Sequence, residues 1–379
     1  MEKRLLFITA GLGFGGAEKM LVFVANELSR RGNACEIVNL NTAGDYTHAS
    51  FQSIDESVTV YTVPQPHSGK NNRLYHLREI KRAALDFRAD VLVSFLAFPN
   101  FYGTIVGKIL RIPSVMSERG DPIREKGAES AKGKIVRMVT NWADGGVFQT
   151  EGAQKCYRKG LQKRGTVIPN PIFVREETPA VSVSEREKTV VSVGRFDNQQ
   201  KRYDVMLAAF RLFSEKHPEY LLKLYGAGDD EQLVRSWTAE QGLSDRVRFM
   251  GVTSHAMCDI AHDGMFLITS DYEGISNALL EAMAVGLPCV STDHTPGGAR
   301  LLITDHENGL LAPIGDAAKL AEAMGEFADD PALSEKCGQN ARAVIDRFAP
   351  GRIIDLWENY LNLVIKKRHR AGKREHTDE

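Results

Sequence analysis

Short apolar runs alternate along the chain with longer segments in which apolar residues recur every three or four positions. Buried parallel strands give the first pattern and amphipathic helices give the second. In the first half, strands are expected at 5–9, 34–40, 90–95, 113–118, 146–149 and 166–168, with helices at 17–31 and 74–87. In the second half, strands are expected at 190–193, 221–225, 247–249, 265–269 and 288–291. The alternation predicts an α/β fold in which helices cover both faces of parallel sheets.

A polar stretch divides this alternation into two parts. Residues 173–188 lack clear periodicity, and strand and helix patterns restart at Thr189. A chain of 379 residues is also long for a single core. We therefore predict a first domain over 1–172, a linker over 173–188 and a second domain over 189–350. A further helix is expected over 351–367, followed by a disordered tail over 368–379 that has no apolar anchor.

The net charge of −1 hides an uneven distribution of charge. Residues 1–180 hold 25 Lys and Arg against 18 Asp and Glu, and the excess is concentrated between residues 101 and 175. A solvated basic face is one interpretation. The other is a contact with anionic lipid headgroups or with a diphosphate-linked acceptor. We expect no nucleic-acid partner.

Composition indicates a cytoplasmic globular protein. The chain is 43% hydrophobic and contains no apolar run of the roughly 18 to 20 residues that span a membrane. The start, MEKRLLFITAGLGF, is interpreted as the first strand because its apolar run leads into a glycine turn. Five scattered cysteines without zinc-ligand spacing predict reduced thiols and no structural metal.

The first predicted strand ends in a glycine-rich loop. Gly11, Gly13 and Gly16 fit G-x-G-x-x-G, and a helix follows, whose free N–H groups can hold a phosphate. A dinucleotide site also needs an acidic residue at the end of the second strand, where this chain has Asn39-Leu40-Asn41. The loop therefore predicts an anion-facing turn and argues against NAD, with a tight turn that binds nothing as the alternative.

The segment DYEGISNALLEAMAVGLPCVST places two carboxylates eight residues apart. Ser276 or Asn277 is the expected N-cap of a buried helix, and Gly286 is the expected residue after its end. Glu281 lies within this helix among apolar residues, while Glu273 precedes it. Because a buried carboxylate requires a partner, Glu281 must meet a cation, a group of donors or the hydroxyls of a ligand.

Two cations follow the first strand of the second half, in VVSVGRFDNQQKRYDVM. Arg195 and Lys201 stand at a strand's carboxyl end, where ligands bind in open α/β sheets. Fixed cations there could stabilise the charge of a departing diphosphate without a metal. Arg202 could take the place of Lys201, and a pair of solvated loop cations is the alternative.

The string E-x7-E followed by A-M-A-x-G-x-P resembles the signature of the retaining glycosyltransferases of family 4. The resemblance implies a GT-B fold, with two Rossmann-like domains facing each other across a cleft, and a nucleotide-activated sugar as donor. It implies that Glu273 contacts the donor sugar and Glu281 the ribose hydroxyls. The family's usual Arg and Lys correspond to Arg195 and Lys201. This chain departs from the pattern at Arg202, where glycine is common, and its loop is one residue longer.

The resemblance extends over nearly the whole chain. It implies catalytic roles for Glu273, Arg195 and Lys201. Acceptor or sugar contacts are expected from Asn100, in place of a histidine that many members carry, and from Glu118 and Arg119, for which a structural pair is the alternative. The last helix is expected to pack back onto the first domain. The implied donor-binding residues are Gly15, Gly16, Gly226, Gly251, Val252, Gly274, Ile275, Ser276, Asn277, Ala278, Leu279 and Glu281.

The expected activity is retaining transfer of a hexosyl unit from a nucleotide diphosphate sugar, with UDP as the expected nucleotide. The expected acceptor is a glycan or a polyprenyl-diphosphate-linked glycan at the inner face of the cell membrane, during synthesis of capsule or exopolysaccharide. No D-x-D motif is present, so neither metal nor cofactor is expected. The alternatives are a GT-B nucleotide-sugar epimerase, an NAD-dependent oxidoreductase and a non-catalytic module that binds nucleotide sugars.

Overall fold

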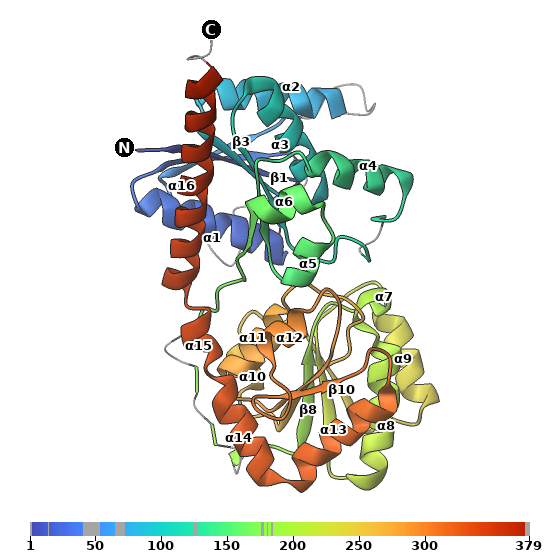
Figure 1. Ribbon diagram of the computed structural model, residues 1–379. Helices are drawn as coiled ribbons and strands as arrows, with labels where there is room; N and C mark the ends of the chain where they lie inside the picture. Colours follow the sequence, from blue (N-terminus) through green and yellow to red (C-terminus); the bar gives the residue numbers. More distant parts are fainter. Residues whose placement is uncertain are drawn as a thin grey trace. The chain divides into compact units, whose positions relative to one another are not determined.

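The computed structural model describes residues 2–13, 15–40, 54–64, 73–124, 127–175, 178–179, 181–182 and 185–375, with side chains described only as far as Lys367 in the last helix. Within these residues the chain divides into two compact units (Figure 1). Unit 1 contains Met1–Pro169 and Gly351–Glu379, and unit 2 contains Asn170–Pro350. The predicted end of the first domain at 172 is close to this division, whereas the segment predicted as a linker, 173–188, belongs to unit 2.

Unit 1 is built on a parallel sheet with the strand order β3-β2-β1-β4-β5-β6-β7 in the described residues. Its strands are β1 (Arg4–Thr9), β2 (Ala34–Asn39), β3 (Val58–Thr62), β4 (Val91–Phe95), β5 (Ser114–Glu118), β6 (Gly145–Phe148) and β7 (Gly165–Val167). Its helices are α1 (Gly16–Arg30), α2 (Arg73–Asp86), α3 (Ala97–Leu110), α4 (Ala131–Thr140), α5 (Glu151–Lys155), α6 (Lys159–Arg164) and α16 (Pro350–Glu375). A buried cluster joins β1, β2 and β4 to α2 and α3.

Unit 2 repeats this architecture with the strand order β10-β9-β8-β11-β12-β13, again parallel in its described residues. Its strands are β8 (Thr189–Val193), β9 (Leu221–Tyr225), β10 (Val247–Gly251), β11 (Met265–Ile268), β12 (Cys289–Thr292) and β13 (Leu310–Ala312). Its first helices are α7 (Asn198–Lys201), α8 (Tyr203–Lys216), α9 (Glu231–Glu240), α10 (Ala256–Ile260) and α11 (Asn277–Ala284). They are followed by α12 (Gly298–Leu302), α13 (Ala317–Asp329), α14 (Pro331–Ala341) and α15 (Val344–Arg347).

The predicted α/β fold with two parallel sheets is confirmed. Every strand expected from the sequence is present, with bounds shifted by at most two residues. Two short strands, β3 and β13, were not predicted. The last helix also differs, because α16 continues to Glu375 through part of the stretch expected to be disordered. Residues 376–379 lie outside the described residues.

Helix α16 packs against the sheet of unit 1, as the family resemblance implied. Its Trp357 is fully buried, and its ring is nearly parallel to that of Phe95, with centroids 5.7 Å apart. The guanidinium of Arg119 lies 5.3 Å from the centroid of each ring. One turn further along, the hydroxyl of Tyr360 accepts a hydrogen bond from the N–H of Gly146, at 2.7 Å. These contacts bind the end of the chain to β4, β5 and β6.

We expect Trp357→Ala to lower the free energy of unfolding by about 3 to 5 kcal/mol, because it removes a large buried side chain and leaves a cavity beside Phe95. Leu356→Ala changes the neighbouring residue of the same helix, which is 42% exposed, and should cost no more than about 0.5 kcal/mol. Urea unfolding of both variants measures the difference. Equal stabilities would show that α16 does not anchor the chain at Trp357.

Candidate active site

The sheet of unit 2 has a topological switch point between β8 and β11. From β8 the chain goes to β9 on one side, whereas β11 pairs with the other side of β8. The loops after these two strands therefore separate and leave room at the carboxyl edge of the sheet, where ligands bind in open α/β folds. The loop after β8 leads through Arg195 to Lys201 in α7, and the loop after β11 carries Ser270 and Glu273.

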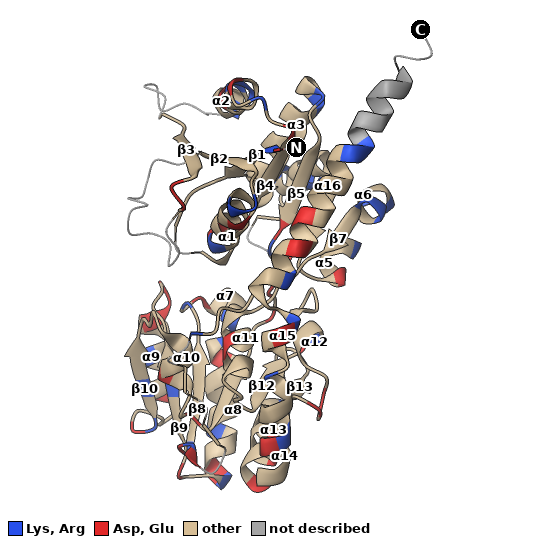
Figure 2. Cartoon of the chain, turned by 90° about the vertical axis from the view of Figure 1, so that its left-hand side faces the viewer, with Lys and Arg blue, Asp and Glu red and all other residues tan. Residues whose placement is uncertain are grey.

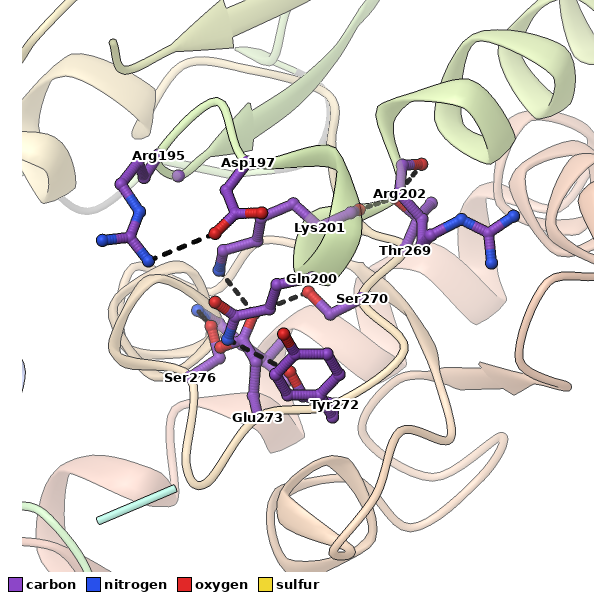
Figure 3. A network of polar contacts seen from close by, with 12 residues as sticks. Arg195, Asp197, Gln200, Lys201, Arg202, Thr269, Ser270, Tyr272, Glu273 and Ser276 are labelled. Atoms are coloured by element: carbon purple, nitrogen blue, oxygen red, sulfur yellow. Dashed lines mark hydrogen bonds and ion pairs between the residues drawn. The ribbon is translucent and has the colours of Figure 1, made fainter. Parts of the chain in front are cut away.

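Lys201 and Glu273 form an ion pair at this switch point (Figure 3). Their side chains are only 16% and 8% exposed. The hydroxyl of Ser270 donates a second hydrogen bond to the same oxygen of Glu273, Oε1, at 2.6 Å. Burial raises the pKa of Glu273, but the positive charge of Lys201 and these hydrogen bonds together lower it below its usual value. Glu273 is therefore a carboxylate at neutral pH.

Arg202 does not take the place of Lys201. Its backbone is left-handed (φ 53°), and its side chain points away from Glu273 (Figure 3). The guanidinium of Arg202 contacts Asp204 at 2.8 and 2.9 Å and Asp271 at 3.1 Å. These hydrogen bonds raise the pKa of Arg202, and those to Asp204 contribute most. These two carboxylates fix the loop and leave Lys201 as the cation at Glu273.

Arg195 stands at the exposed side of this loop. Its side chain is 68% exposed and contacts Asp197 at 3.4 Å. A surface pair of this length contributes little to stability. The guanidinium can therefore turn toward an anionic ligand without the loss of a buried contact.

Glycines bring the neighbouring loops close to the Lys201 loop. Gly226 follows β9 with a φ of 142°, and a β-carbon there would come within 1.9 Å of the carbonyl oxygen of Gly194. Its N–H donates to the carbonyl of Gly251, which ends β10 with a φ of 77°. Val252 follows and is 76% exposed. These predicted donor-binding residues thus lie along the carboxyl edge of the same sheet.

Helix α11 begins beside Glu273. Ser276, one of the two residues expected at this position, is its N-cap. The hydroxyl of Ser276 accepts a hydrogen bond from the N–H of Leu279 at 3.4 Å. Asn277 accepts a hydrogen bond from Asn170 at 2.8 Å. Glu281 is half-buried on this helix. The remaining predicted donor-binding residues precede Ser276 or occupy the first turn of α11: Gly274, Ile275 and Ala278.

His294 belongs to this site and was not predicted. It lies in the loop after β12, which bonds to the Glu273 loop through the N–H of Glu273 and the carbonyl of Thr295, at 2.8 Å. The ring is 1% exposed, and neither ring nitrogen has a hydrogen-bond partner of normal geometry among the described residues, although the backbone of Thr295 is close. Burial lowers the pKa of His294, so the ring is neutral beside Glu273. Nothing in the spacing of this loop distinguished the histidine from a packed side chain.

The predicted acceptor residues lie in unit 1 and make internal contacts there. Asn100 is 1% exposed, and its amide bonds to both the N–H and the carbonyl of Ser117 in β5. Glu118 accepts hydrogen bonds from Tyr157 and from the N–H of Arg119, and burial raises its pKa. Burial lowers the pKa of Arg119 to about 9. These contacts favour the structural alternative for Glu118 and Arg119, and a sugar contact of Asn100 stays a prediction.

The glycine loop of unit 1 leads into α1. Gly15 is the N-cap of this helix, and Gly16 is its first residue. A β-carbon on Gly15 would approach a carboxylate oxygen of Glu18 to 2.1 Å, so an acidic side chain of the first turn lies at this helix end. Phe14 lies outside the described residues. A phosphate contact at this loop stays a prediction.

The part of the chain that the structure describes contains no cluster of three or more His, Cys, Asp or Glu side chains suited to a metal ion. None of the helices in the same residues combines the length and the apolar character needed to cross a membrane.

Two family models together match the chain from residue 14 to residue 344. The model "Glycosyltransferase Family 4" matches residues 14–175, and the model "Glycosyl transferases group 1" matches residues 174–344. The chain belongs to the family 4 glycosyltransferases. The predicted family and the GT-B fold are therefore confirmed, and the oxidoreductase and epimerase alternatives lose their basis.

The relatives described here match more than nine tenths of this glycosyltransferase. An uncharacterized glycosyltransferase of Haemophilus influenzae is 21% identical over 95% of this chain and 100% of its own. A Campylobacter jejuni enzyme, GalNAc-alpha-(1->4)-GalNAc-alpha-(1->3)-diNAcBac-PP-undecaprenol alpha-1,4-N-acetyl-D-galactosaminyltransferase, is 24% identical over 93% of this chain and 97% of its own. The crystal structure of Anabaena HepE in complex with UDP and glucose superposes with a TM-score of 0.78 at 20% identity, over 95% of this chain and 100% of that one.

We expect His294→Gln to reduce the loss of stability of the transferase on acidification. The folded state holds the pKa of His294 below its ordinary value of about 6.5, so the unfolded chain binds more protons below that pH. Stability contributed by the neutral ring is present above about pH 6.5 and is lost as the pH falls. The substitution should remove up to about 1.4 kcal/mol of this loss per pH unit.

Urea unfolding between about pH 7.5 and about pH 5.5 tests this expectation, because Glu273 acts in a different window. The pKa of Glu273 is lowered, so its contribution is retained above its unfolded value of about 4.3 and disappears only as the pH falls further. Lys216→Met, at an exposed position of α8, is therefore the control and should leave the slope of this range unchanged. An identical slope for His294→Gln and the wild type would contradict a neutral, buried His294.

Proposed function

We propose that the transferase moves a hexosyl unit from UDP-sugar to a glycan or lipid-linked glycan, with retention of configuration and without a metal. The ion pair of Lys201 and Glu273 carries this proposal. It holds a cation and a carboxylate, both nearly inaccessible, at the carboxyl edge where a donor would bind. Solved structures of similar fold include Anabaena HepE in complex with UDP and with UDP-glucose, which supports UDP as the nucleotide.

The chemistry follows from the charges of the site. When the donor's glycosidic bond breaks, negative charge develops on the oxygens of the leaving diphosphate. Lys201 and Arg195 are cations at the same edge of the sheet and can stabilise that charge, Lys201 from a fixed position and Arg195 from an exposed one. Glu273 would accept hydrogen bonds from the sugar hydroxyls, and Glu281 from the ribose. The leaving diphosphate itself would help to deprotonate the acceptor on the same face of the sugar.

The proposed biological role is the assembly of bacterial surface polysaccharide at the inner face of the cell membrane. The Campylobacter jejuni relative acts on an undecaprenol-linked glycan. Two Rhizobium meliloti relatives, 28% and 30% identical, are named for lipopolysaccharide core biosynthesis. An acceptor attached to a polyprenyl diphosphate is the class we propose, with a peripheral position of the enzyme on the membrane.

A thermal-shift panel tests the proposed donor class. We expect UDP to raise the melting temperature of the wild type in EDTA, whereas GDP, ADP and NAD should not, because stabilisation follows binding to the folded state. Lys201→Met should abolish the shift, since it removes the fixed cation. Lys216→Met replaces an exposed lysine at the end of α8 and is the matched control, which should keep the full shift. A shift only with NAD, or an unchanged shift in Lys201→Met, would contradict the proposal.

A further inference from the structure

Helix α4 and the turn that follows it carry an exposed apolar stripe. Ile135, Met138 and Trp142 are 53%, 42% and 53% exposed and follow one another at helical spacing. Exposed Lys134 flanks the stripe, while Val136 and Val139 are buried on the side of the helix that packs on unit 1. A soluble surface rarely groups large apolar side chains in this way unless something covers them. Trp142 is also the kind of residue that prefers a membrane interface.

A basic cavity adjoins this stripe. Its volume is about 550 Å³, and Trp142 forms part of its wall. Three of its lining residues, Lys108, Arg158 and Arg164, are cations, against one carboxylate, Asp144. Helix α6, beside the cavity, adds Lys159 and Lys163 and is largely blue in Figure 2. The lining residues are Lys108, Asn141, Trp142, Asp144, Arg158, Gly160, Leu161 and Arg164.

The contacts inside the cavity differ among its cations. Lys108 pairs with Asp144 at 2.7 Å, and Arg164 donates to the carbonyls of Asn141 and Ala143 at 3.2 and 3.1 Å. Arg158 is exposed, and its backbone N–H is held by the side chain of Asn141 at 2.7 Å. This hydrogen bond fixes the backbone of Arg158 at the cavity, while its side chain stays exposed. Together the lining groups leave a net positive charge for an anion.

We propose that this α4 surface, formed by Lys134, Ile135, Met138, Trp142 and the adjoining cavity, docks on an anionic lipid bilayer. The apolar stripe would enter the interfacial region, and the cavity would receive the phosphate of one lipid headgroup. Apolar residues next to clustered Lys and Arg are the combination that binds anionic bilayers, because insertion and electrostatic attraction add. The proposal rests on the proposed lipid-linked acceptor, which would keep the substrate in the same bilayer.

Sedimentation of the full chain with vesicles tests the docking. We expect binding to vesicles of phosphatidylcholine with phosphatidylglycerol, and much weaker binding to phosphatidylcholine alone. Lys134→Glu with Arg158→Glu should weaken binding to the anionic vesicles by about tenfold or more, because each basic residue near such a surface contributes to the attraction. Lys216→Glu with Arg248→Glu reverses two exposed charges of unit 2 and should bind as the wild type does.

Tryptophan fluorescence tests insertion of the stripe. The chain has three tryptophans, of which Trp142 is exposed, Trp357 is buried and Trp237 packs against the core of unit 2. Anionic vesicles should shift the emission of the wild type to shorter wavelength, and a brominated lipid should quench it. Trp142→Phe should lose both responses. Glycerol phosphate and inorganic phosphate should cause no shift, which separates a bilayer from a free phosphate.

Each outcome decides between docking and its alternatives. Equal binding of wild type and Lys134→Glu with Arg158→Glu, or an emission shift that persists in Trp142→Phe, would overturn the proposal. So would the absence of binding to anionic vesicles, which would indicate that a protein covers the stripe. UDP thermal shifts measured on the same samples distinguish the two proposals. A normal UDP shift without vesicle binding would refute docking alone, and vesicle binding without a UDP shift would refute the donor class alone.

Discussion

The ion pair between Lys201 and Glu273 is the interaction around which unit 2 is arranged. Removing two charges from water costs several kcal/mol each, and only close pairing with further hydrogen bonds offsets that cost. The chain meets this requirement by bringing two loops, separated by about 70 residues in sequence, to one point of the sheet. Ser270 adds a donor to Glu273, and Gly194 leaves room for the lysine, since a β-carbon there would lie 3.2 Å from its Cε.

The need to keep Lys201 paired with Glu273 explains the contacts of the residues around this pair. Arg202 is held by Asp204 and Asp271, so the additional positive charge of this chain does not compete for Glu273. The backbone contact of Gly226 with the Gly194 loop holds the second loop against the first. The outcome is a cation that stays ordered without a ligand. For a transferase, such a preorganised cation avoids reorganisation when charge develops on a leaving group.

The rule that ligands bind at the carboxyl ends of parallel strands was sufficient to predict much of this site from the sequence. Arg195, Lys201 and Glu273 follow predicted strands, and the carboxyl ends of parallel strands share one edge, so their proximity could be expected. The cap at Ser276 was likewise local, because an N-cap is recognised by residue type and by the helix that follows. The edge strands β3 and β13 were missed; in β3 only Val58 is buried, so this strand lacks the continuous apolar run of the central strands.

Contacts between distant segments were not predictable in the same way. The contacts of Trp357 with Phe95 and with Arg119 join residues more than 200 positions apart. The burial of His294 beside Glu273 depends on how the loop after β12 returns to the site. A single histidine forms no motif with neighbouring residues by which the sequence could have identified it. The amide of Asn100 likewise completes the backbone bonding of β5, and its contact with a sugar stays a prediction. In each of these cases tertiary packing determines the partner.

A double-mutant cycle between Lys201→Met and Glu273→Gln tests the central claim most directly when it is measured by urea unfolding without UDP and at one UDP concentration that saturates the wild type. The account predicts a clear coupling energy in the free protein, because each single variant leaves a buried charge without its partner. With UDP the coupling should become markedly smaller, since the diphosphate would replace Glu273 as the partner of Lys201. A coupling energy that UDP leaves unchanged would show that the pair is a structural bond and not part of a donor site.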